Sequence, residues 1–442
     1  MNARMNARIV CALMIVASIT SVSVKAQERS PSWTLTPLYT FLGEADGASS
    51  GEVGLDPAGN LYGTTAYGGQ AGCGYGSYGC GVAFKLNPRG GESILHTFTA
   101  PPDGANSYVG LLRDSSGVFY GETNAGGSNG AGIIFKLTPQ PRACASVLCP
   151  WHETILHQFS GGSGDGAYPE GDLIEDSSGN VYGTTSGGGS MGFGAVFKLD
   201  SAGNESILYF FGNLPDGQYP FGALLRDQAG NLYGTTNSGG TSNAGTVFEL
   251  SPSGSGWTEQ VLYDFTGGSD GAAPLAGLIA DEQGNLYGTT TAGGDLNCGA
   301  LGSCGVVFEV SPSPHGWGET VLHTFTGSPD GGDPLFGALI RDGAGNLYGT
   351  TSQGGIATGC PGEVGCGTVF ELSPNGSSWT ESILYRFTGQ ADGNAPIGPV
   401  TMDAHGNLYG AAYYGGDLNS NSPACLFFGT PVGCGTVFKL TP

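Results

Sequence analysis

A seven-fold repeat dominates this sequence and constrains its fold more than any other feature. Successive copies of the repeat's clearest word, an aromatic residue followed by glycine, are 51 to 62 residues apart, Gly183 to Gly234 being the shortest step and Gly121 to Gly183 the longest. A period of this length is typical of repeats that each form one small β-sheet. The copies are Leu61-Tyr62-Gly63, Phe119-Tyr120-Gly121, Val181-Tyr182-Gly183, Leu232-Tyr233-Gly234, Leu286-Tyr287-Gly288, Leu347-Tyr348-Gly349 and Leu408-Tyr409-Gly410.

Each repeat is predicted to contain four antiparallel strands, as the sixth copy illustrates. Residues 334–342 form a short apolar segment that predicts a first strand, and residues 343–346 are glycine, alanine and asparagine residues suited to a hairpin turn. Residues 347–351 then predict the second strand. Residues 367–372 alternate in polarity and predict the third strand, and residues 383–387 predict the fourth.

Four strands in each of seven units predict an all-β protein, a seven-bladed β-propeller that spans residues 27–442. The chain after the leader begins with a fourth-strand segment, residues 37–41, and ends with a third-strand segment, residues 435–440. Pairing these two segments would remove an exposed sheet edge, so we expect the N-terminal strand to complete the last blade. An open solenoid would instead need polar capping repeats, and neither end of the sequence shows one.

Residues 1–26 predict a secretory signal peptide. Arg4 and Arg8 precede an apolar stretch, and small residues lie just before Gln27. A retained membrane anchor is the alternative, but the apolar stretch is short for a spanning helix. We therefore expect a secreted, periplasmic or extracellular protein with no membrane span after signal cleavage and no C-terminal anchor.

The ten cysteines that follow the leader form five close pairs. An even number of cysteines in an exported chain predicts disulfides. Four of the pairs lie in the repeats with the longest segment between the second and third strands, so each is predicted to cross-link a long loop. A zinc site is the alternative, although the spacing is not that of structural zinc and no histidine lies beside the pairs. The pairs are Cys73 with Cys80, Cys144 with Cys149, Cys298 with Cys304, Cys360 with Cys366, and Cys425 with Cys434.

The recurring words Gly-Asn-Leu-Tyr-Gly-Thr-Thr, Gly-Gly, Gly-Thr-Val-Phe-Glu-Leu and Leu-Tyr-x-Phe resemble the tandem glycine-rich repeat of exported bacterial proteins known as the GloVer type. The resemblance covers essentially the whole chain after the leader. The first half of each unit is also similar to NHL propeller repeats, although the Gly-Thr-Thr departs from their pattern. Members of the GloVer group commonly end in a surface anchor, which we do not expect in this chain, and the resemblance implies no catalytic residues.

An aspartate followed by glycine recurs in each connection between a fourth strand and the next first strand. The simplest interpretation is an aspartate that accepts backbone hydrogen bonds in a tight turn. The alternative is a ring of carboxylates that holds cations, which makes calcium the one candidate cofactor, although no full calcium-loop motif is present. These aspartates are Asp46, Asp103, Asp165, Asp216, Asp270, Asp330 and Asp392.

Functional residues are expected where one repeat departs from its siblings. Glu122 replaces a threonine that five other repeats contain, and Tyr413 and Tyr414 belong to a segment that departs from the common Thr-Thr word. His405 lies in a turn, where exposure is expected. Neutral drift is the alternative explanation for all four. Where other repeats have a tyrosine in the fourth strand, three have a histidine, which predicts tyrosine substitutes rather than a set of bases: His96, His157 and His323.

Charge and motifs limit the function. A net charge of −23 with only 14 lysines and arginines disfavours nucleic acid and anionic lipid as partners. The sequence has no Gly-x-Ser-x-Gly and no His-Glu-x-x-His, so no catalytic residue is assigned. We expect an exported, monomeric, non-catalytic propeller that binds a polysaccharide or an envelope protein. The alternatives are a polysaccharide lyase or hydrolase that uses Glu122 or Tyr414, and a structural envelope protein whose aspartates hold calcium.

Overall fold

The computed structural model describes residues 33–73, 78–99, 101–139, 151–254, 256–298, 302–356, 360, 364–427 and 430–442. The signal peptide predicted for residues 1–26 and the predicted pair Cys144 and Cys149 lie outside these residues.

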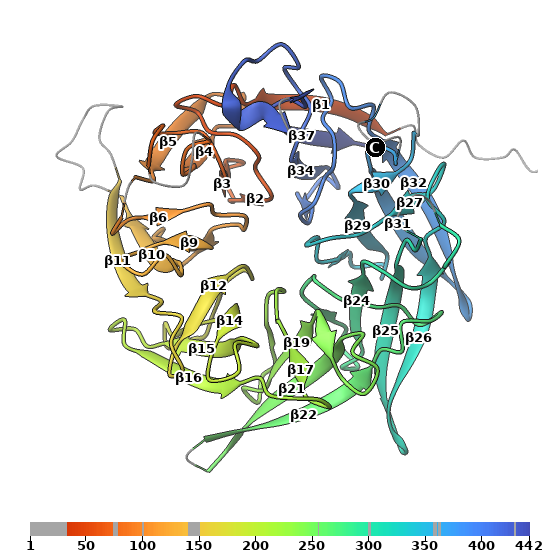
Figure 1. Ribbon diagram of the computed structural model, residues 1–442. Helices are drawn as coiled ribbons and strands as arrows, with labels where there is room; N and C mark the ends of the chain where they lie inside the picture. The colour runs from red at the N-terminus through yellow and green to blue at the C-terminus, as the bar shows by residue number, and fades with distance from the viewer. Residues whose placement is uncertain are drawn as a thin grey trace, which may run out of the picture. The chain divides into compact units, whose positions relative to one another are not determined.

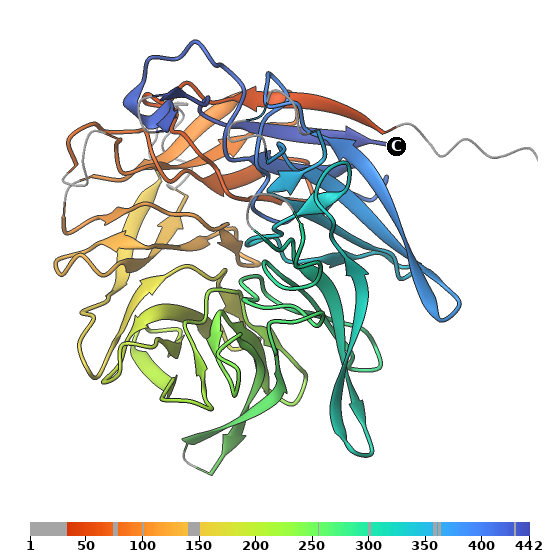
Figure 2. The same ribbon diagram turned by 45° about the vertical axis from the view of Figure 1, so that its right-hand side comes forward.

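Residues 33–442 form seven antiparallel sheets arranged as blades around a ring, which Figure 1 shows face-on and Figure 2 obliquely. The one helical element among the described residues is a short 3-10 turn, Pro423–Cys425. The predicted seven-bladed β-propeller is therefore confirmed. Blade 6 has the order β28 (Ile340–Arg341), β29 (Leu347–Thr351), β31 (Thr368–Asn375) and β32 (Ser378–Arg386) from the inner to the outer strand.

The other blades repeat this order. Blade 1 contains β2 (Val53–Leu55), β3 (Leu61–Thr64), β4 (Val82–Leu86) and β5 (Glu92–Thr97). Blade 2 contains β7 (Leu112–Arg113), β8 (Phe119–Thr123), β10 (Ile133–Thr138) and β11 (His152–Gln158). Blade 3 contains β13 (Ile174–Glu175), β14 (Val181–Gly188), β15 (Ala195–Leu199) and β16 (Glu205–Phe210).

Blade 4 contains β18 (Leu225–Arg226), β19 (Leu232–Thr236), β21 (Thr246–Ser253) and β22 (Gly256–Asp264). Blade 5 contains β23 (Ile279–Ala280), β24 (Leu286–Thr290), β25 (Val306–Ser313) and β26 (Gly316–Thr324). Blade 7 contains β33 (Thr401–Met402), β34 (Leu408–Ala412), β37 (Thr436–Thr441) and β1 (Thr34–Thr40).

Short strands pair in the connections at one end of the blades. They are β6 (Gly104–Ala105) with β9 (Ala125–Gly126), β17 (Gly217–Gln218) with β20 (Ser238–Gly239), β27 (Gly331–Gly332) with β30 (Gln353–Gly354), β35 (Leu426–Phe427) with β36 (Thr430–Pro431), and β12 (Gly166–Pro169) with β14.

The N-terminal strand closes the ring, as predicted. Strand β1 pairs antiparallel with β37, and Leu35 lies opposite Leu440. The last blade is thus built from both ends of the described chain, and β37 is not left as an exposed edge.

The predicted extent of the first strand is wrong. In blade 6 only Ile340 and Arg341 pair with the second strand, whereas residues 334–339 do not. The amide of Phe336 instead donates to the carbonyl oxygen of Ile397 in blade 7 at 3.0 Å. Phe336 therefore satisfies its backbone amide on the neighbouring blade rather than within its own sheet.

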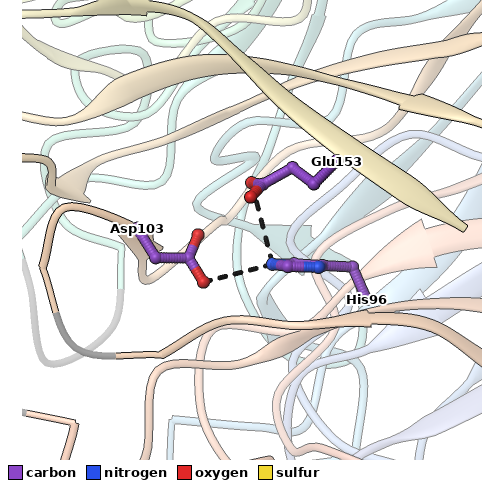
Figure 3. Close-up of side chains that lie close together, drawn as sticks. All are labelled: His96, Asp103 and Glu153. Atoms are coloured by element: carbon purple, nitrogen blue, oxygen red, sulfur yellow. Dashed lines mark hydrogen bonds and ion pairs between the residues drawn. The ribbon is translucent and has the colours of Figure 1, made fainter. Parts of the chain in front are cut away.

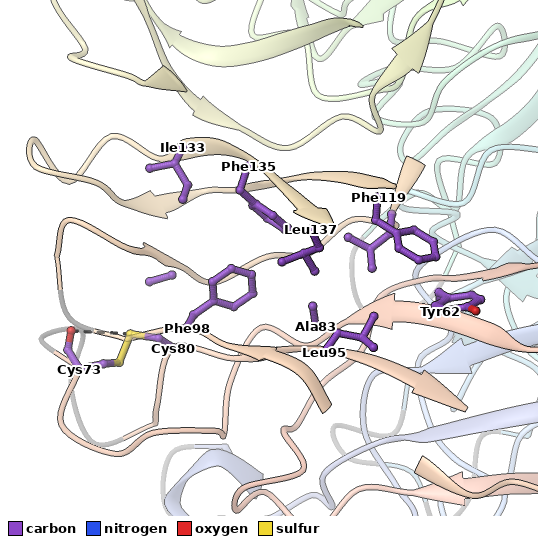
Figure 4. Packing of buried hydrophobic residues seen from close by; sticks show 12 residues of the cluster. Tyr62, Cys73, Cys80, Ala83, Leu95, Phe98, Phe119, Ile133, Phe135 and Leu137 are labelled. Atoms are coloured by element: carbon purple, nitrogen blue, oxygen red, sulfur yellow. Dashed lines mark hydrogen bonds between the residues drawn. A yellow bond between two sulfur atoms is a disulfide. The ribbon is translucent and has the colours of Figure 1, made fainter. Parts of the chain in front are cut away.

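The core lies between adjacent blades, and pairs of phenylalanine rings join each blade to the next. Phe98 after β5 meets Phe135 of blade 2 edge to face, with ring centroids 5.2 Å apart (Figure 4). Such a pair contributes about 0.5–1.5 kcal/mol beyond the burial of its area. The same contact recurs at all seven seams, in the pairs Phe41–Phe84, Phe159–Phe197, Phe211–Phe248, Phe265–Phe308, Phe325–Phe370 and Phe387–Phe438.

The phenylalanine rings explain why each repeat has a glycine after its aromatic residue. A Cβ atom added to Gly349 would lie 2.6 Å from the ring of Phe370 on the neighbouring strand, which is too close for any side chain. The corresponding glycine of every other blade faces its phenylalanine in the same way. Glycine is therefore needed at this position so that the ring can lie against the second strand.

The four described cysteine pairs form the predicted disulfides, Cys73–Cys80, Cys298–Cys304, Cys360–Cys366 and Cys425–Cys434. Each spans six to nine residues between the second and third strands of its blade. None of the helices in the described ranges is both long and apolar enough to cross a membrane.

Candidate functional site

Residues from all seven blades line a small cavity, which therefore lies on the axis of the ring. Its volume is about 20 Å³, and we call it the central cavity. Three of its lining residues are acidic, namely Glu52, Glu170 and Asp172, and none of its described lining residues is lysine, arginine or histidine. The axis of the propeller is therefore strongly acidic.

Two of these acids are departures from the repeat. Each blade has an aspartate in the hairpin that follows its first strand, and Glu52 and Asp172 stand four residues before that aspartate. At the same position the other five blades carry small residues or proline, namely Gly110, Ala223, Gly277, Ala338 and Pro399. The acidic side chains are thus specific to blades 1 and 3, and the repeat itself does not require them.

Glu122 reaches the same region from blade 2. It lies in β8 at a position where sibling threonines donate their hydroxyl to the backbone of the next blade, as Thr235 does to the Ala276 carbonyl at 2.9 Å. In blade 3 the backbone position that corresponds to Ala276 is Gly171, which stands between Glu170 and Asp172 in the sequence. Glu122 lies near Asp172 and Glu170, and Asp172 in turn lies beside Glu52. The sequence analysis missed these three acids, and we call Glu52, Glu122, Glu170 and Asp172 the central carboxylates.

Glu122 is the most buried of the central carboxylates. Its side chain is 0% exposed, and neither carboxyl oxygen makes a well-aligned hydrogen bond, although the nearby Gly171 backbone acts to lower its pKa. Burial, with the nearby carboxyls of Asp172 and Glu170, raises the pKa of Glu122 well above its usual range. Burial also raises the pKa of Glu52 well above its usual range, and the neighbouring Asp172 adds to this effect. Burial raises the pKa of Glu170 to about 7.

Two of the other central carboxylates accept hydrogen bonds from neutral donors. The amide of Gly110 in blade 2 donates to Asp172 Oδ1 at 2.8 Å, and Asn124 Nδ2 donates to Glu170 Oε1. These bonds fix both acids across the seam between blades 2 and 3. They supply no positive charge, and the raised pKa values of Glu52, Glu122 and Glu170 indicate that bound protons neutralise part of the cluster.

A larger pocket adjoins the central cavity. Its volume is about 440 Å³, and the two cavities share Tyr108, Phe336 and Ile397 as lining residues. The predicted residues Tyr413 and Tyr414 line it, and their rings meet edge to face with centroids 4.9 Å apart. We call it the tyrosine pocket. It lies at the end of the blades that carries the disulfide loops, because its walls include the segments between the second and third strands of blades 6 and 7.

The two tyrosines play different parts in this pocket. Tyr413 is only 8% exposed and packs with Ile397 and Ala66, whereas Tyr414 is half-buried. Tyr67 and Tyr108 pack against the same cluster, and their hydroxyl oxygens lie 3.5 Å from each other. Tyr414 is therefore the more accessible of the pair.

Polar groups face the aromatic wall from blade 6. Gln353 Nε2 donates to Asp333 Oδ2 at 2.9 Å, and the Ser352 hydroxyl donates to the same oxygen at 3.2 Å. Burial raises the pKa of Asp333. All three residues line the tyrosine pocket, which therefore combines aromatic faces with a fixed carboxylate and amide.

His405 does not belong to this site. It lies in the hairpin between the first and second strands of blade 7, and in an antiparallel blade that hairpin is at the opposite end from the disulfide loops. Its side chain is 86% exposed and lies 4.0 Å from Asp403. The structure thus brings Glu122, Tyr413 and Tyr414 to one face and places His405 on the other.

The seven connection aspartates have the predicted turn role. Asp392 accepts the amide of Thr388 at 2.8 Å and the hydroxyl of Tyr385 at 3.0 Å. Each of the other six likewise accepts a backbone amide four or five residues before it, from Leu42, Thr99, Ser160, Gly212, Thr266 or Thr326.

The three fourth-strand histidines act as tyrosine substitutes, as predicted. His96 Nε2 lies 3.2 Å from Asp103 Oδ2 and 3.7 Å from Glu153 Oε1 of the next blade (Figure 3). In the seam between blades 7 and 1, Tyr39 takes the same place and donates to Asp46 at 3.1 Å and Glu92 at 2.9 Å. Either side chain therefore joins an aspartate to a glutamate across a seam.

The sequence analysis missed these glutamates, although a signal for them exists. In each case a glutamate stands three residues before the leucine of the fourth strand, and only the N-terminal strand has a leucine, Leu35, instead. Burial raises the pKa of all six to about 7. We call them the seam glutamates: Glu92, Glu153, Glu205, Glu259, Glu319 and Glu381.

The fold and the site together define a seven-bladed β-propeller with an acidic axis and a tyrosine-lined pocket on its disulfide-loop face. The Gloeobacter/Verrucomicrobia repeat matches residues 74–302 and 299–442 of the sequence. The chain therefore belongs to this repeat family, which confirms the resemblance found in its words. No curated protein matches the sequence.

Solved structures share the architecture at low identity. The extracellular domain of a protein assigned as a one-component system in B. thetaiotaomicron is 10% identical, with a TM-score of 0.51 over 91% of this chain, which spans 39% of that protein's chain. A protein assigned as a 6-phosphogluconolactonase from Bacteroides uniformis is 13% identical, with a TM-score of 0.47 over 84% of this chain and 91% of its own. A protein of unknown function from Dyadobacter fermentans is 10% identical, with a TM-score of 0.44 over 93% and 99% of the two chains. Similarity at this level shows the fold alone.

Proposed function

We propose that the protein is an exported, non-catalytic propeller that binds a saccharide in the tyrosine pocket. The observation that carries this proposal is the composition of the pocket, where Tyr108 and Tyr414 stand near the fixed side chains of Asp333 and Gln353. Aromatic faces pack against the apolar faces of sugar rings. Carboxylates accept hydrogen bonds from sugar hydroxyls, and amide groups both donate hydrogen bonds to hydroxyls and accept them. A volume of about 440 Å³ lies within the range of small-ligand sites.

Charge narrows the class of saccharide. Asp333 lines the tyrosine pocket. The chain as a whole carries a net charge of −23. An anionic chain of uronic acids or sulfated sugars would be repelled by this field, so the ligand expected is a neutral saccharide or an amino sugar.

Export is supported by the disulfides. Four described cysteine pairs are cross-linked, and disulfides of this kind persist in oxidising compartments. Their loops lie on the face that holds the tyrosine pocket, and they stiffen the surface that an extracellular ligand would meet.

A non-catalytic role is favoured over a lyase or hydrolase by the burial of Glu122. Its carboxyl is 0% exposed and cannot contact a polymer at the mouth of the pocket. An acid that protonates a glycosidic oxygen must come within hydrogen-bond distance of that oxygen.

The test is binding of the secreted protein to a panel of neutral, amino and acidic polysaccharides, read for both retention and release of new chain ends. We expect retention of a neutral or amino polysaccharide without cleavage, and at least tenfold weaker binding by Tyr414→Ala. The matched control is Tyr168→Ala, because Tyr168 is 47% exposed in a connection of blade 3, outside the pocket. Failure of every polysaccharide to bind would overturn the proposal and favour an envelope protein as ligand, whereas new chain ends would favour the enzyme.

A further inference from the structure

We propose that Asp333 makes the tyrosine pocket selective for a saccharide with a free amino group, because its carboxylate binds the ammonium group of the sugar. This inference rests on the proposed function and narrows its ligand to amino sugars that are not acetylated. Among the described residues that line the pocket, Asp333 is the one charged residue. A carboxylate in an otherwise neutral, aromatic pocket is best satisfied by a cationic group of the ligand.

The repeat does not require a charge at the position of Asp333. Three residues after its connection aspartate, each blade has a residue in the left-handed region, with φ between 53° and 61°. Side chains other than glycine are uncommon there, and asparagine and aspartate are the best tolerated. The carboxylate is nevertheless specific to blade 6, because the siblings are all neutral: Ser49, Asn106, Tyr168, Tyr219, Ala273 and Ala395.

Two neighbouring loops fix Asp333 in place. Its amide donates to the carbonyl oxygen of Cys304 at 3.0 Å, and Cys304 is cross-linked to Cys298 in the disulfide loop of blade 5. Its own carbonyl oxygen accepts the amide of Ser352 at 3.1 Å. Gln353 holds the side chain through Oδ2 at 2.9 Å. The carboxylate is therefore oriented before a ligand arrives, which lowers the entropic cost of binding.

One oxygen of Asp333 remains for a ligand. Ser352 and Gln353 both donate to Oδ2, and no donor among the described residues reaches Oδ1. Burial raises the pKa of Asp333, the two donors act to lower it, and no basic side chain in the described ranges contributes. An ammonium group at Oδ1 would supply the missing positive charge through a charge-assisted hydrogen bond.

The rest of the pocket suits a cationic sugar. Tyr108, Phe336 and Tyr414 line it, and aromatic rings attract a cation over their faces as well as packing against sugar rings. The net charge of −23 also attracts a cationic ligand. Acetylation of the amine removes the positive charge, so an acetylated sugar would gain neither contribution.

The experiment is calorimetric titration of the secreted chain with two short oligosaccharides of equal length, one of glucosamine and one of N-acetylglucosamine. Both are measured at about pH 6, where an amine carries a proton. We expect the glucosamine oligosaccharide to bind at least tenfold more tightly. In Asp333→Asn the preference should fall below twofold, because asparagine has no charge but keeps an oxygen for Ser352 and Gln353. The backbone tolerates asparagine, since Asn106 has a φ of 58° at the same position of blade 2.

The control is Glu282→Gln, which removes one negative charge from an exposed hairpin turn. It should retain the tenfold preference, whereas a general attraction of cations to an acidic protein would weaken the preference equally in both variants. Asp333→Ala, which reproduces Ala273 of blade 5, is the second variant if asparagine lowers the melting temperature, and it should also lose the preference.

Three results would overturn the inference. They are equal or weaker binding of the glucosamine oligosaccharide by the unmodified protein, a preference that persists in the Asp333 variants, and an equal loss of preference in Glu282→Gln. In each case a saccharide still binds, so the proposed function stands. If neither oligosaccharide binds and no polysaccharide of the wider panel is retained, the proposed function fails and this inference fails with it.

Discussion

The amide of Phe41 donates to the carbonyl oxygen of Gly435 at 3.1 Å, so the first and last strands of the described chain share a hydrogen-bonded sheet. The same residue packs its ring against Phe84 of blade 1, with centroids 5.2 Å apart. Phe41 therefore takes part in two closures at once, one within blade 7 and one between blades 7 and 1. The N-terminal segment is therefore expected to stabilise the closed ring.

A chain that begins after Phe41 should lose much of its stability. Deleting residues 33–41 leaves the edge of β37 without its partner and removes one of the seven phenylalanine pairs. We expect a large fall in melting temperature and association through the exposed strand edge, measured by calorimetry and size-exclusion chromatography. A chain that begins at Trp33 is the control and should unfold like a chain that begins at Gln27. Equal melting temperatures for the two chains would show that closure contributes little.

The seam glutamates should make the protein less stable as pH rises. A carboxyl with a folded pKa of about 7, above its ordinary value near 4.5, binds its proton more tightly in the native state. Its contribution to stability is therefore present below about pH 4.5 and lost as pH rises through 7. The melting temperature should fall between pH 5 and pH 8.

Glu319→Gln isolates this effect. Burial and the nearby Asp270 raise the pKa of Glu319, and glutamine removes the titration while keeping the shape of the side chain. The variant should show a shallower fall of melting temperature with pH and should be more stable than the unmodified protein at pH 8. Glu282→Gln is the control, because Glu282 is exposed in a hairpin turn. A slope identical to that of the unmodified protein would contradict the prediction.

Replacing Glu122 with the threonine of its siblings should stabilise the protein. The substitution removes a fully buried carboxyl and restores a hydroxyl of the kind that Thr235 donates to the next blade. We expect a higher melting temperature than that of the unmodified protein, measured by calorimetry at neutral pH. A lower melting temperature would mean that Glu122 itself stabilises the seam between blades 2 and 3.

The fold could be predicted from the sequence because each blade repeats the contacts that build it. Gly349 must lie under Phe370, and Phe325 must meet the same ring, so each word of the repeat is fixed by a packing need that recurs seven times. The extent of the first strand was not predictable in this way. Residues 334–339 bond partly to the next blade, and an apolar segment gives no sign of which backbone will be its partner.

The candidate site was predictable only in part. Glu122 stands out because it replaces a threonine within a well-aligned word. Glu52 and Asp172 stand at one register position in two different blades, and comparing that position in all seven copies would have revealed both. Their convergence with Glu170 depends on how the ring curves, and the order of residues along the chain does not contain that information.

The threonines at the position of Glu122 provide a matched pair for measuring the bond between blades. Thr235 is 1% exposed and donates to the Ala276 carbonyl at 2.9 Å, whereas Thr289 is 2% exposed and its hydroxyl has no hydrogen-bond partner. Thr235→Val should lower the free energy of unfolding by about 1–2 kcal/mol, because it leaves a buried carbonyl oxygen without its donor. Thr289→Val should be neutral or stabilising, because it removes an unsatisfied hydroxyl while preserving shape. Both values follow from chemical denaturation, and an equal loss in the two variants would mean that packing rather than hydrogen bonding determines the preference for threonine.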